Sequence, residues 1–413
     1  MNSGYLLSVV VPTRNRQYYA KKTVEQILSI ADEAGTVQIV VTDNSDDDSL
    51  SRLLGELLKH PDVTYEFTPH RIPGVDNYAK GIGLSKGQYV CCIGDDDAVL
   101  PDIVPVAEWA SAHKIPAVKF GAQAIYVWPN AIKGRESGQL SLDRFSSRAY
   151  EVDVRKELVD FLHTGCSDLP SADIPKAYHG LVRRDMYELI KEKTGRYCGG
   201  LSPDIYLGVS LATMIEKLTC IDIPLTVFGA CRQSTTGDSL NKVNVSKLED
   251  APHFVGQEYE WDSLVPRYYC GANIWADSAL HALSDLGERA LREEFSVEHI
   301  TAYGLVECPD FKDEIMALLD KVEHDDIKIA QLVKDENKQK RLKAIKDGVK
   351  NTRLLSKAYY AVRSVIRSTR GDERLLLRDV VSCAEAADVV QGRIASRANE
   401  LLENLRREES ELA

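Results

Sequence analysis

The chain has 413 residues, of which 44% are apolar and 28% are charged, and its formal net charge is -12. This length and apolar content predict two or three folded domains and exclude a chain that is disordered throughout. The negative charge argues against a general nucleic-acid-binding protein, because contacts with phosphates need a basic surface.

The nine cysteines are scattered along the chain and form no CxxC pair. This spacing argues against a disulfide framework and against a structural zinc site. No window of about 20 apolar residues is present, so we expect no helix that crosses a membrane. The apolar run at Tyr5–Pro12 is too short for a secretion signal and is typical of a buried strand. The sequence therefore predicts a reduced, cytoplasmic protein.

Strand and helix patterns alternate over residues 1–120. The predicted elements are strands at Tyr5–Val11, Val37–Val41, Val63–Phe67 and Gln88–Ile93, and helices at Tyr18–Ala31, Leu50–Leu58 and Asn77–Leu84. This order predicts a doubly wound parallel sheet, which binds its ligands beyond the carboxyl ends of the strands.

Residues 115–235 are less regular. The strand-like pieces are Ala117–Val127, His179–Val182 and Leu218–Val227, and a helix is expected near Asp204–Ile215. We expect these strands to extend the same sheet in antiparallel fashion. A polar loop follows at residues 236–265, and the chain is mostly helical from about residue 270.

A run of acidic residues, Gly94–Asp97, comes directly after the fourth predicted strand. Neighbouring carboxylates repel each other and are costly to bury without a cation. Carboxylates two residues apart can converge on one divalent ion, with substrate phosphates completing its shell. The alternative is an ordinary solvated acidic turn.

Two further acidic residues are candidates for function. Asp43 follows the second strand and could accept a hydrogen bond from a nucleobase or ribose, and the alternative is an Asx turn. Asp204 opens a predicted helix, and the alternative is a capping role. Pro12–Arg16 occupies the place where a dinucleotide-binding fold carries GxGxxG, and no phosphate-binding P-loop is present.

Taken in order, these features resemble the family 2 glycosyltransferases of GT-A fold. The similar stretches, which span roughly residues 5–235, are Val9–Arg16, Val40–Ser45, Ala79–Val90, Asp96–Pro101, Leu181–Tyr187 and Ser202–Asp204. The sequence departs from the family pattern where Gly94 replaces an Asp, Gly81 an Asn and Pro203 a Glu.

The resemblance implies an α/β fold with a mixed, mainly parallel sheet flanked by helices. The residue pattern after about residue 270, with almost no Gly or Pro after Pro309, adds an all-helical C-terminal region. We expect a catalytic domain at residues 1–240, with a nucleotide-binding half at 1–115 and an acceptor half at 116–240. A connecting loop at 241–269 and a helical region at 270–413 complete the predicted organisation.

The resemblance also implies roles for individual residues. Asp43 is expected at the nucleobase, Lys80 at the nucleotide or pyrophosphate, and Asp204 as the base that deprotonates the acceptor. The remaining expected nucleotide-sugar contacts are Pro12, Thr13, Arg14, Arg16, Asp95 and Asp96. The expected ligands of Mg²⁺ or Mn²⁺ are drawn from Asp95, Asp96 and Asp97, without a decision as to which two bind.

Three other features are secondary candidates. His179 could contact the acceptor, and the alternative is a structural histidine at a strand start. His253 could be a metal ligand. The segment Gly229–Leu240 could close over the diphosphate, and the alternative is an ordinary surface loop.

The C-terminal helices carry a separate pattern. Lys334–Arg370 contains 12 Lys or Arg residues against 3 Asp or Glu residues, with apolar residues at helical spacing. Such a helix could attach peripherally to the anionic inner face of a membrane, and the alternative is packing on the catalytic domain or a partner. The pattern of Leu375–Leu412 suits a helical hairpin or a contact in a homo-oligomer.

The sequence thus predicts an inverting, hexosyltransferase-like enzyme. It would move a sugar from a nucleoside diphosphate donor, with UDP favoured, to a hydroxyl of a surface polysaccharide or glycolipid. The alternatives are a sugar-phosphate nucleotidyltransferase and a non-catalytic scaffold with a degenerate domain of this fold.

Overall fold

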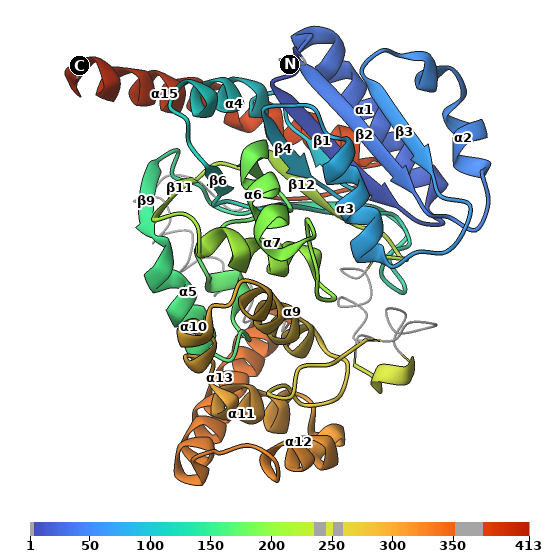
Figure 1. Ribbon diagram of the computed structural model, residues 1–413. Coiled ribbons are helices and arrows are strands. Elements are labelled where there is room, and N and C mark those ends of the chain that lie inside the picture. Colours follow the sequence, from blue (N-terminus) through green and yellow to red (C-terminus); the bar gives the residue numbers. More distant parts are fainter. Residues whose placement is uncertain (1–3, 235–244, 251–258, 352–374, 413) are drawn as a thin grey trace.

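The computed structural model describes residues 4–234, 245–250, 259–351 and 375–412. Figure 1 shows the N-terminal sheet and its helices at one end of the molecule and a group of helices at the other end. The segment between them carries most of the remaining strands and helix α7 (Pro203–Ala212), which packs on helix α9 (Gly271–Asp285) of the C-terminal group.

The first part of the chain alternates strands and helices as predicted. Its elements are β1 Leu7–Thr13, α1 Gln17–Ala34, β2 Val37–Asp43, α2 Ser49–Leu54, η1 Gly55–Lys59, β3 Val63–Phe67, α3 Gly74–Leu84, β4 Tyr89–Cys92, β5 Ala98–Val99 and α4 Ile103–Ala112. All four predicted strands and all three predicted helices of residues 1–120 are confirmed, with the second helix ending as a 3-10 turn.

The middle part contains most of the remaining strands. Its elements are β6 Ala117–Phe120, β7 Ala124–Val127, β8 Gln139–Leu142, β9 Ala149–Asp153, α5 Val154–His163, η2 Leu169–Ser171, β10 Gly180–Arg183, α6 Arg184–Thr194, α7 Pro203–Ala212, β11 Lys217–Ile221, β12 Thr226–Ala230 and η3 Leu248–Asp250.

The main sheet has eight strands in the order β3-β2-β1-β4-β10-β6-β11-β9. Strands β3, β2, β1 and β4 are parallel, and β10 runs antiparallel to both β4 and β6. The register pairs Thr13 at the end of β1 with Asp43 at the end of β2. The mixed, mainly parallel character of the sheet is confirmed.

A second sheet corrects the prediction for residues 115–235. It has five strands in the order β13-β8-β7-β12-β5. The stretches Ala117–Val127 and Leu218–Val227 were each expected to be one strand, but each divides between the two sheets. Their parts pair in parallel, β6 with β11 in the first sheet and β7 with β12 in the second. The two stretches therefore cross from one sheet to the other side by side, which hydropathy alone does not reveal.

Helix α3 packs very closely on β1. A Cβ atom at Gly81 would lie 2.4 Å from Val10 Cγ1, so only glycine fits this contact without a shift of Val10. The glycine that departs from the family pattern at this position therefore has a packing reason in this chain.

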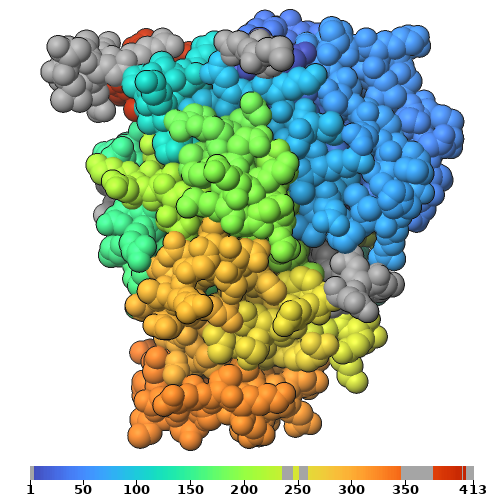
Figure 2. All heavy atoms as spheres, viewed as in Figure 1, coloured from blue at the N-terminus to red at the C-terminus, as the bar shows by residue number. Residues whose placement is uncertain are grey.

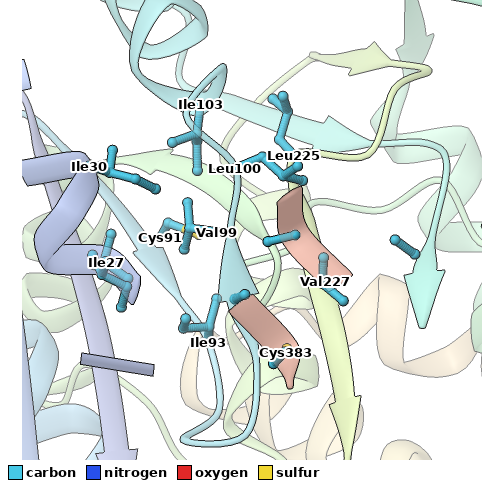
Figure 3. Packing of buried hydrophobic residues seen from close by; sticks show 14 of the residues in the cluster. Ile27, Ile30, Cys91, Ile93, Val99, Leu100, Ile103, Leu225, Val227 and Cys383 are labelled. Carbon is cyan, nitrogen blue, oxygen red and sulfur yellow. The ribbon is translucent and has the colours of Figure 1, made fainter. Parts of the chain in front are cut away.

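The hydrophobic core falls into two clusters of buried residues. The first lies between α1, α4, the two sheets and helix α15, and it contains Ile27, Ile93, Val99, Val227 and Cys383. Figure 3 shows these side chains converging from elements that are distant in sequence. The second cluster lies on the other face of the main sheet and continues into the C-terminal helices.

The C-terminal part is mainly helical. Its elements are α9 Gly271–Asp285, α10 Arg289–Glu293, α11 Val297–Glu307, η4 Pro309–Phe311, α12 Lys312–Leu319, α13 Asp326–Asn351, β13 Leu375–Arg378 and α15 Cys383–Leu412. Figure 2 shows α9 to α13 as one mass that adjoins the middle part of the chain. The helical C-terminal region is confirmed, and it also contributes strand β13.

The end of the chain returns to the N-terminal part. Strand β13 pairs with β8, and α15 buries Val390, Ile394 and Ala398 in the first hydrophobic cluster. The expected helical hairpin over Leu375–Leu412 is wrong, since the segment is one strand and one helix. Among the described residues, no helix is both long enough and apolar enough to cross a membrane.

Candidate active site

The loop after β1 meets the acidic run after β4. The Thr13 hydroxyl donates a hydrogen bond of 2.5 Å to Asp95 Oδ2. The Arg16 guanidinium lies between two carboxylates, 3.0 Å from Asp95 Oδ1 and 3.3 Å from Asp96 Oδ1. Both carboxylates are at most 3% exposed. The structure therefore brings four of the predicted donor-site residues together at the carboxyl ends of β1 and β4.

Burial and charge set the protonation of this cluster. Burial and the neighbouring Asp96 raise the pKa of Asp95 to about 7, although Arg16 lowers it. Burial and Asp97 raise the pKa of Asp96, again against the effect of Arg16. Burial would lower the pKa of Arg16, but the two carboxylates raise it above its usual value. One guanidinium thus compensates two buried carboxylates only in part.

Asp97 has a different environment. Its Oδ1 accepts a hydrogen bond from the Gly229 amide at 2.5 Å. Its Oδ2 accepts from the Gly94 amide at 2.5 Å and the Tyr178 hydroxyl at 2.7 Å, and His179 Nε2 lies 2.9 Å away. Burial would raise the pKa of Asp97, but His179, Tyr178 and Gly229 lower it below its usual value.

The start of the Gly229–Leu240 segment is attached to the acidic run. The Cys231 amide donates a hydrogen bond of 2.9 Å to Asp96 Oδ2. A Cβ atom at Gly229 would lie 1.8 Å from the Asp96 carbonyl oxygen, so the close approach requires glycine. This part of the segment is therefore a wall of the site, while residues 235–244 lie outside the described residues.

Asp43 is fully buried at the end of β2. Its Oδ1 accepts a hydrogen bond of 2.8 Å from the Ser45 amide, which is the geometry of the Asx turn named as the alternative. Its Oδ2 accepts a hydrogen bond of 2.9 Å from the Tyr65 hydroxyl on β3. Burial and Asp43 together raise the pKa of Tyr65. The structure thus fixes the carboxylate, and the nucleobase contact stays a prediction.

The loops after β1 and β2 are joined to each other. Arg14 donates hydrogen bonds to the Asn44 carbonyl at 3.0 Å and to Asp46 Oδ1 at 2.5 Å. Asn15 has a left-handed backbone, with φ of 55°, and its amide donates to Ser45 Oγ at 2.8 Å. Arg14 therefore ties two walls of the site together, which is a structural role beside its predicted contact with the donor.

Two other predicted donor contacts lie near this rim. Pro12 is paired with Thr42 inside the sheet, one residue before Thr13. Lys80 on α3 forms an ion pair of 2.6 Å with Glu66 and donates a hydrogen bond of 2.8 Å to Thr68 Oγ1. Its contact with a pyrophosphate stays a prediction, because it requires the ammonium group to leave or share these partners.

Asp204 is the second residue of helix α7 and is partly exposed. The Ser202 hydroxyl donates a hydrogen bond of 2.5 Å to its Oδ1. No described residue donates a hydrogen bond to Oδ2, so this oxygen can accept a proton from a substrate. Burial above all, then Cys92 and Tyr187, and last the charge of Asp204, raise the pKa of Tyr78, which packs in the same cluster as Cys92 at the end of β4.

Part of the chain matches the sequence model of a known protein family, in agreement with the motifs and the geometry of the site. Residues 8–136 match the family model described as Glycosyl transferase family 2. The predicted resemblance to the family 2 glycosyltransferases is therefore confirmed over this segment.

A curated relative points the same way. The chain is 30% identical over 104 residues to the protein named Uncharacterized glycosyltransferase MG025 from Mycoplasma genitalium. The match covers 25% of this chain and 35% of the relative, so the chain spans about a third of the length of the relative that it matches.

Solved structures of Staphylococcus aureus TarS are loosely similar. The fragment 1-349 in complex with UDP-GlcNAc gives a TM-score of 0.43 at 14% identity, covering 79% of this chain and 84% of that chain. The complex of the same fragment with UDP gives a TM-score of 0.38 at 13% identity, covering 79% of this chain and 83% of that chain.

The donor set of the acidic run fits a divalent ion held partly by substrate. No three His, Cys, Asp or Glu side chains in the described part of the chain are arranged as a complete metal cage. Mg²⁺ commonly takes only one or two carboxylates and completes its shell with phosphates and water. Asp95 Oδ1 is buried and has the Arg16 guanidinium 3.0 Å away as an ion-pair partner, without a well-aligned hydrogen bond, and Asp96 lies beside it. Asp97 is the least available of the three, since four protein groups surround its carboxylate.

His179 is placed in the interior. Its ring is 1% exposed, its Nε2 faces Asp97, and its Nδ1 lies 2.8 Å from the Thr226 hydroxyl. The ring also stacks on Phe228, with the ring centroids 3.5 Å apart. With both nitrogens occupied, the structural alternative is favoured over contact with an acceptor. His253 lies outside the described residues.

Several residues of the site carry no signal in the sequence. Tyr65 and Tyr178 hold the carboxylates of Asp43 and Asp97, yet each is an ordinary residue of a strand or loop. Gly229 begins the predicted Gly229–Leu240 segment, but nothing in the sequence indicates its hydrogen bond to Asp97. Lys176 was also missed. Burial and the neighbouring Lys119 lower its pKa to about 8, while Asp204 and Asp173 act in the opposite direction. Only the folded chain brings these groups together.

Proposed function

We propose that this chain is an inverting glycosyltransferase that transfers a sugar from a nucleoside diphosphate donor to a hydroxyl acceptor. The observation that carries the proposal is the meeting of Thr13 and Arg16 with Asp95 and Asp96 beside Asp43. It forms one polar site at the carboxyl ends of three neighbouring strands, in a domain that matches family 2.

The residues have distinct roles in this proposal. Asp43 binds the nucleobase, and Thr13 and Arg16 line the nucleotide pocket with Pro12, Arg14 and Lys80 at its rim. Asp95 and Asp96 hold Mg²⁺ or Mn²⁺, with Asp97 as the buried support beside them. When bound, such an ion offsets the charge of the leaving diphosphate.

Asp204 is the proposed general base. The acceptor oxygen forms a bond to the anomeric carbon while the bond from that carbon to the diphosphate oxygen breaks. The diphosphate leaves with the electron pair, and the acceptor proton passes to Asp204 Oδ2. One base and no protein nucleophile imply a single displacement with inversion.

Replacement of the base tests this assignment. Asp204→Asn keeps the size and the Ser202 hydrogen bond but removes basicity, so kcat should fall by roughly two to four orders of magnitude. Affinity for UDP should be unchanged. Near-normal turnover would assign Asp204 to helix capping, because Asn caps about as well as Asp, and would redirect the search to Asp173 and Asp168.

Ligand-dependent melting separates the three candidate functions. UDP with Mn²⁺ should raise the melting temperature if the protein is a transferase, and CTP should raise it if the protein is a nucleotidyltransferase. A scaffold should be stabilised by neither ligand. A panel of nucleotide sugars, beginning with UDP-N-acetylglucosamine, then identifies the donor. The acceptor class proposed is a saccharide or a lipid-linked saccharide.

Peripheral membrane contact is a further part of the proposal. The described part of Lys334–Arg370 exposes basic residues on α13, among them Lys338, Arg341 and Lys343, beside the exposed Leu342 and Ile345. Residues 352–374 lie outside the described part. Vesicles with anionic lipid should co-sediment the protein at low salt but not at high salt, and equal recovery with neutral vesicles would contradict the proposal.

The predicted contact in a homo-oligomer fits the exposed apolar residues of α13 better than it fits α15. The apolar face of α15 is already buried within the chain.

A further inference from the structure

The loop that leads to Asp204 is attached to helix α9 of the C-terminal part. The Ser278 side chain on α9 is fully buried, and its Oγ accepts hydrogen bonds from the backbone amides of Leu201 at 3.1 Å and Ser202 at 2.9 Å. Two successive amides of this loop therefore depend on one hydroxyl from a helix residue that lies 77 and 76 residues later in the chain.

The approach of the loop to α9 is unusually close. Gly200 has a left-handed backbone with φ of 66°, and a Cβ atom there would lie 2.8 Å from both Ser278 Cβ and Ser278 Oγ. A side chain at residue 200 is excluded by the backbone conformation and by the neighbouring serine. Glycine at position 200 therefore allows the loop to lie directly against Ser278 on α9.

The contact continues toward the proposed base. The amide of Ser202 is held by Ser278, and the hydroxyl of Ser202 donates the 2.5 Å hydrogen bond to Asp204 Oδ1. The rest of α7 is buried from Ile205 to Ala212, and the Tyr206 hydroxyl donates a hydrogen bond of 2.7 Å to Asp285 Oδ2 on α9. Because Asp204 Oδ1 is held in this way, the direction of Oδ2 depends on the position of Ser202.

We propose that Ser278 is a positioning residue for sugar transfer, acting through Ser202 on Asp204. This inference rests on the proposed function, in which Asp204 is the base. It gives the helical C-terminal part a role in the reaction, since α9 supplies the group that fixes the start of α7. Ser278 does not contact substrate.

The test compares two buried serines. Ser278→Ala removes the acceptor of two amides, whereas Ser210→Ala removes a buried hydroxyl on α7 that has no hydrogen-bond partner among the described residues. Misplacement of a catalytic group by about 1 Å can lower a rate by about 100-fold. We therefore expect Ser278→Ala to lower kcat about 10- to 100-fold with little change in KM for the nucleotide sugar or in UDP affinity. Ser210→Ala should keep the wild-type kcat.

A double-mutant cycle decides whether Ser278 acts through Asp204. If it does, Ser278→Ala should lower kcat much less in the Asp204→Asn background than in the wild type. The same fold loss in both backgrounds, or equal kcat for Ser278→Ala and Ser210→Ala, would overturn the inference. Absence of any nucleotide-sugar turnover by the wild type would instead overturn the proposed function. A fully active Asp204→Asn would leave that function standing but overturn the assignment of Asp204 as the base, and this inference with it.

A second variant covers a failure of Ser278→Ala to fold. Ser278→Cys keeps a weak acceptor at the same position. Ser278→Cys should fold, keep the wild-type affinity for UDP, and show a kcat between that of the wild type and that of a variant with no hydrogen-bond acceptor at residue 278. A folded Ser278→Cys with wild-type kcat and altered UDP affinity would contradict the positioning role.

Discussion

Replacing a carboxylate of the acidic run by the neutral amide of Asn should change the stability of the fold differently at Asp97 than at Asp96. Asp97 is held in its ionised form by His179, Tyr178 and two backbone amides, and its pKa is lowered despite burial. Asp95 and Asp96 have raised pKa values, because burial and their neighbouring carboxylates disfavour the ionised forms. We therefore expect Asp97→Asn to destabilise the fold and Asp96→Asn to leave stability unchanged or improved.

The magnitude follows from the hydrogen bonds that are lost. The amide of Gly229 faces Asp97 Oδ1 and the amide of Gly94 faces Oδ2. Whichever way an Asn side chain is turned, its NH2 group faces one of these two N–H groups. A buried donor left without an acceptor costs about 1–3 kcal/mol. The hydrogen bond between His179 Nε2 and Asp97 Oδ2 is also weakened, and a hydrogen bond to a charged group contributes about 1.5–3 kcal/mol.

Urea unfolding of the two variants at pH 7 measures the contrast. Asp97→Asn should lower the free energy of unfolding by about 2–4 kcal/mol, whereas Asp96→Asn should change it by less than about 1 kcal/mol. UDP binding in the presence of Mn²⁺ should be lost in Asp96→Asn. Equal loss of stability in both variants would refute the distinction between a supporting and a ligating carboxylate.

The pH dependence supplies a second check on the same residue. Because the folded pKa of Asp97 is depressed, its stabilising contribution is fully present above the unfolded value of about 3.9 and is lost as the pH falls through the folded value. The gap in stability between wild type and Asp97→Asn should therefore be constant from about pH 5 to 7 and narrow only below about pH 4. A gap that narrows already near neutral pH would contradict a depressed pKa.

Two further predictions concern Lys176 and Gly229. The pKa of Lys176 in the folded protein, about 8, lies below the unfolded value, so the unfolded chain binds more protons between these values and wild-type stability rises with pH there. Lys176→Met should thus be more stable than the wild type by about 1–2 kcal/mol near pH 7, after solvent screening is allowed for. Urea unfolding should show that this stability advantage shrinks above about pH 8. Equal stability of the two proteins at pH 7 would refute the prediction. Gly229→Ala forces a Cβ atom against the Asp96 carbonyl and should cost about 1–3 kcal/mol together with loss of UDP binding. Gly392→Ala is the matched control, because a Cβ atom there meets nothing within 4 Å on helix α15 and should stabilise by about 0.5–1 kcal/mol; equal unfolding midpoints for the two variants would argue against the close approach at Gly229.

The sequence by itself determined the strands and helices of residues 1–120. Buried parallel strands such as Val37–Val41 consist of continuous apolar, β-branched runs, and glycines and polar loops separate them from amphipathic helices. These signals are local, so they identify elements without a structure. The same locality placed Asp43 and the acidic run at strand ends, where parallel topology brings them to one edge of the sheet.

Only the tertiary structure decided how the acidic residues differ. Asp95, Asp96 and Asp97 are identical in type and adjacent in sequence, but the chain passes from the first sheet to the second between β4 and β5, and each carboxylate meets different partners. Asp97 reaches Tyr178, His179 and Gly229, which lie 81 to 132 residues away in the chain. Such partners have no periodicity or spacing that a sequence pattern can register.

The C-terminal part depended on tertiary structure for the same reason. The apolar spacing of Leu375–Leu412 suggested a helical hairpin or an oligomer contact. The segment instead forms β13 and α15, and α15 covers the core beside α1 and β12. Helix α9 likewise reads as an ordinary buried helix, yet its Ser278 holds the loop before Asp204. Hydrophobic periodicity fixes which face of a helix is buried, whereas its partner is chosen by the packing of the whole chain.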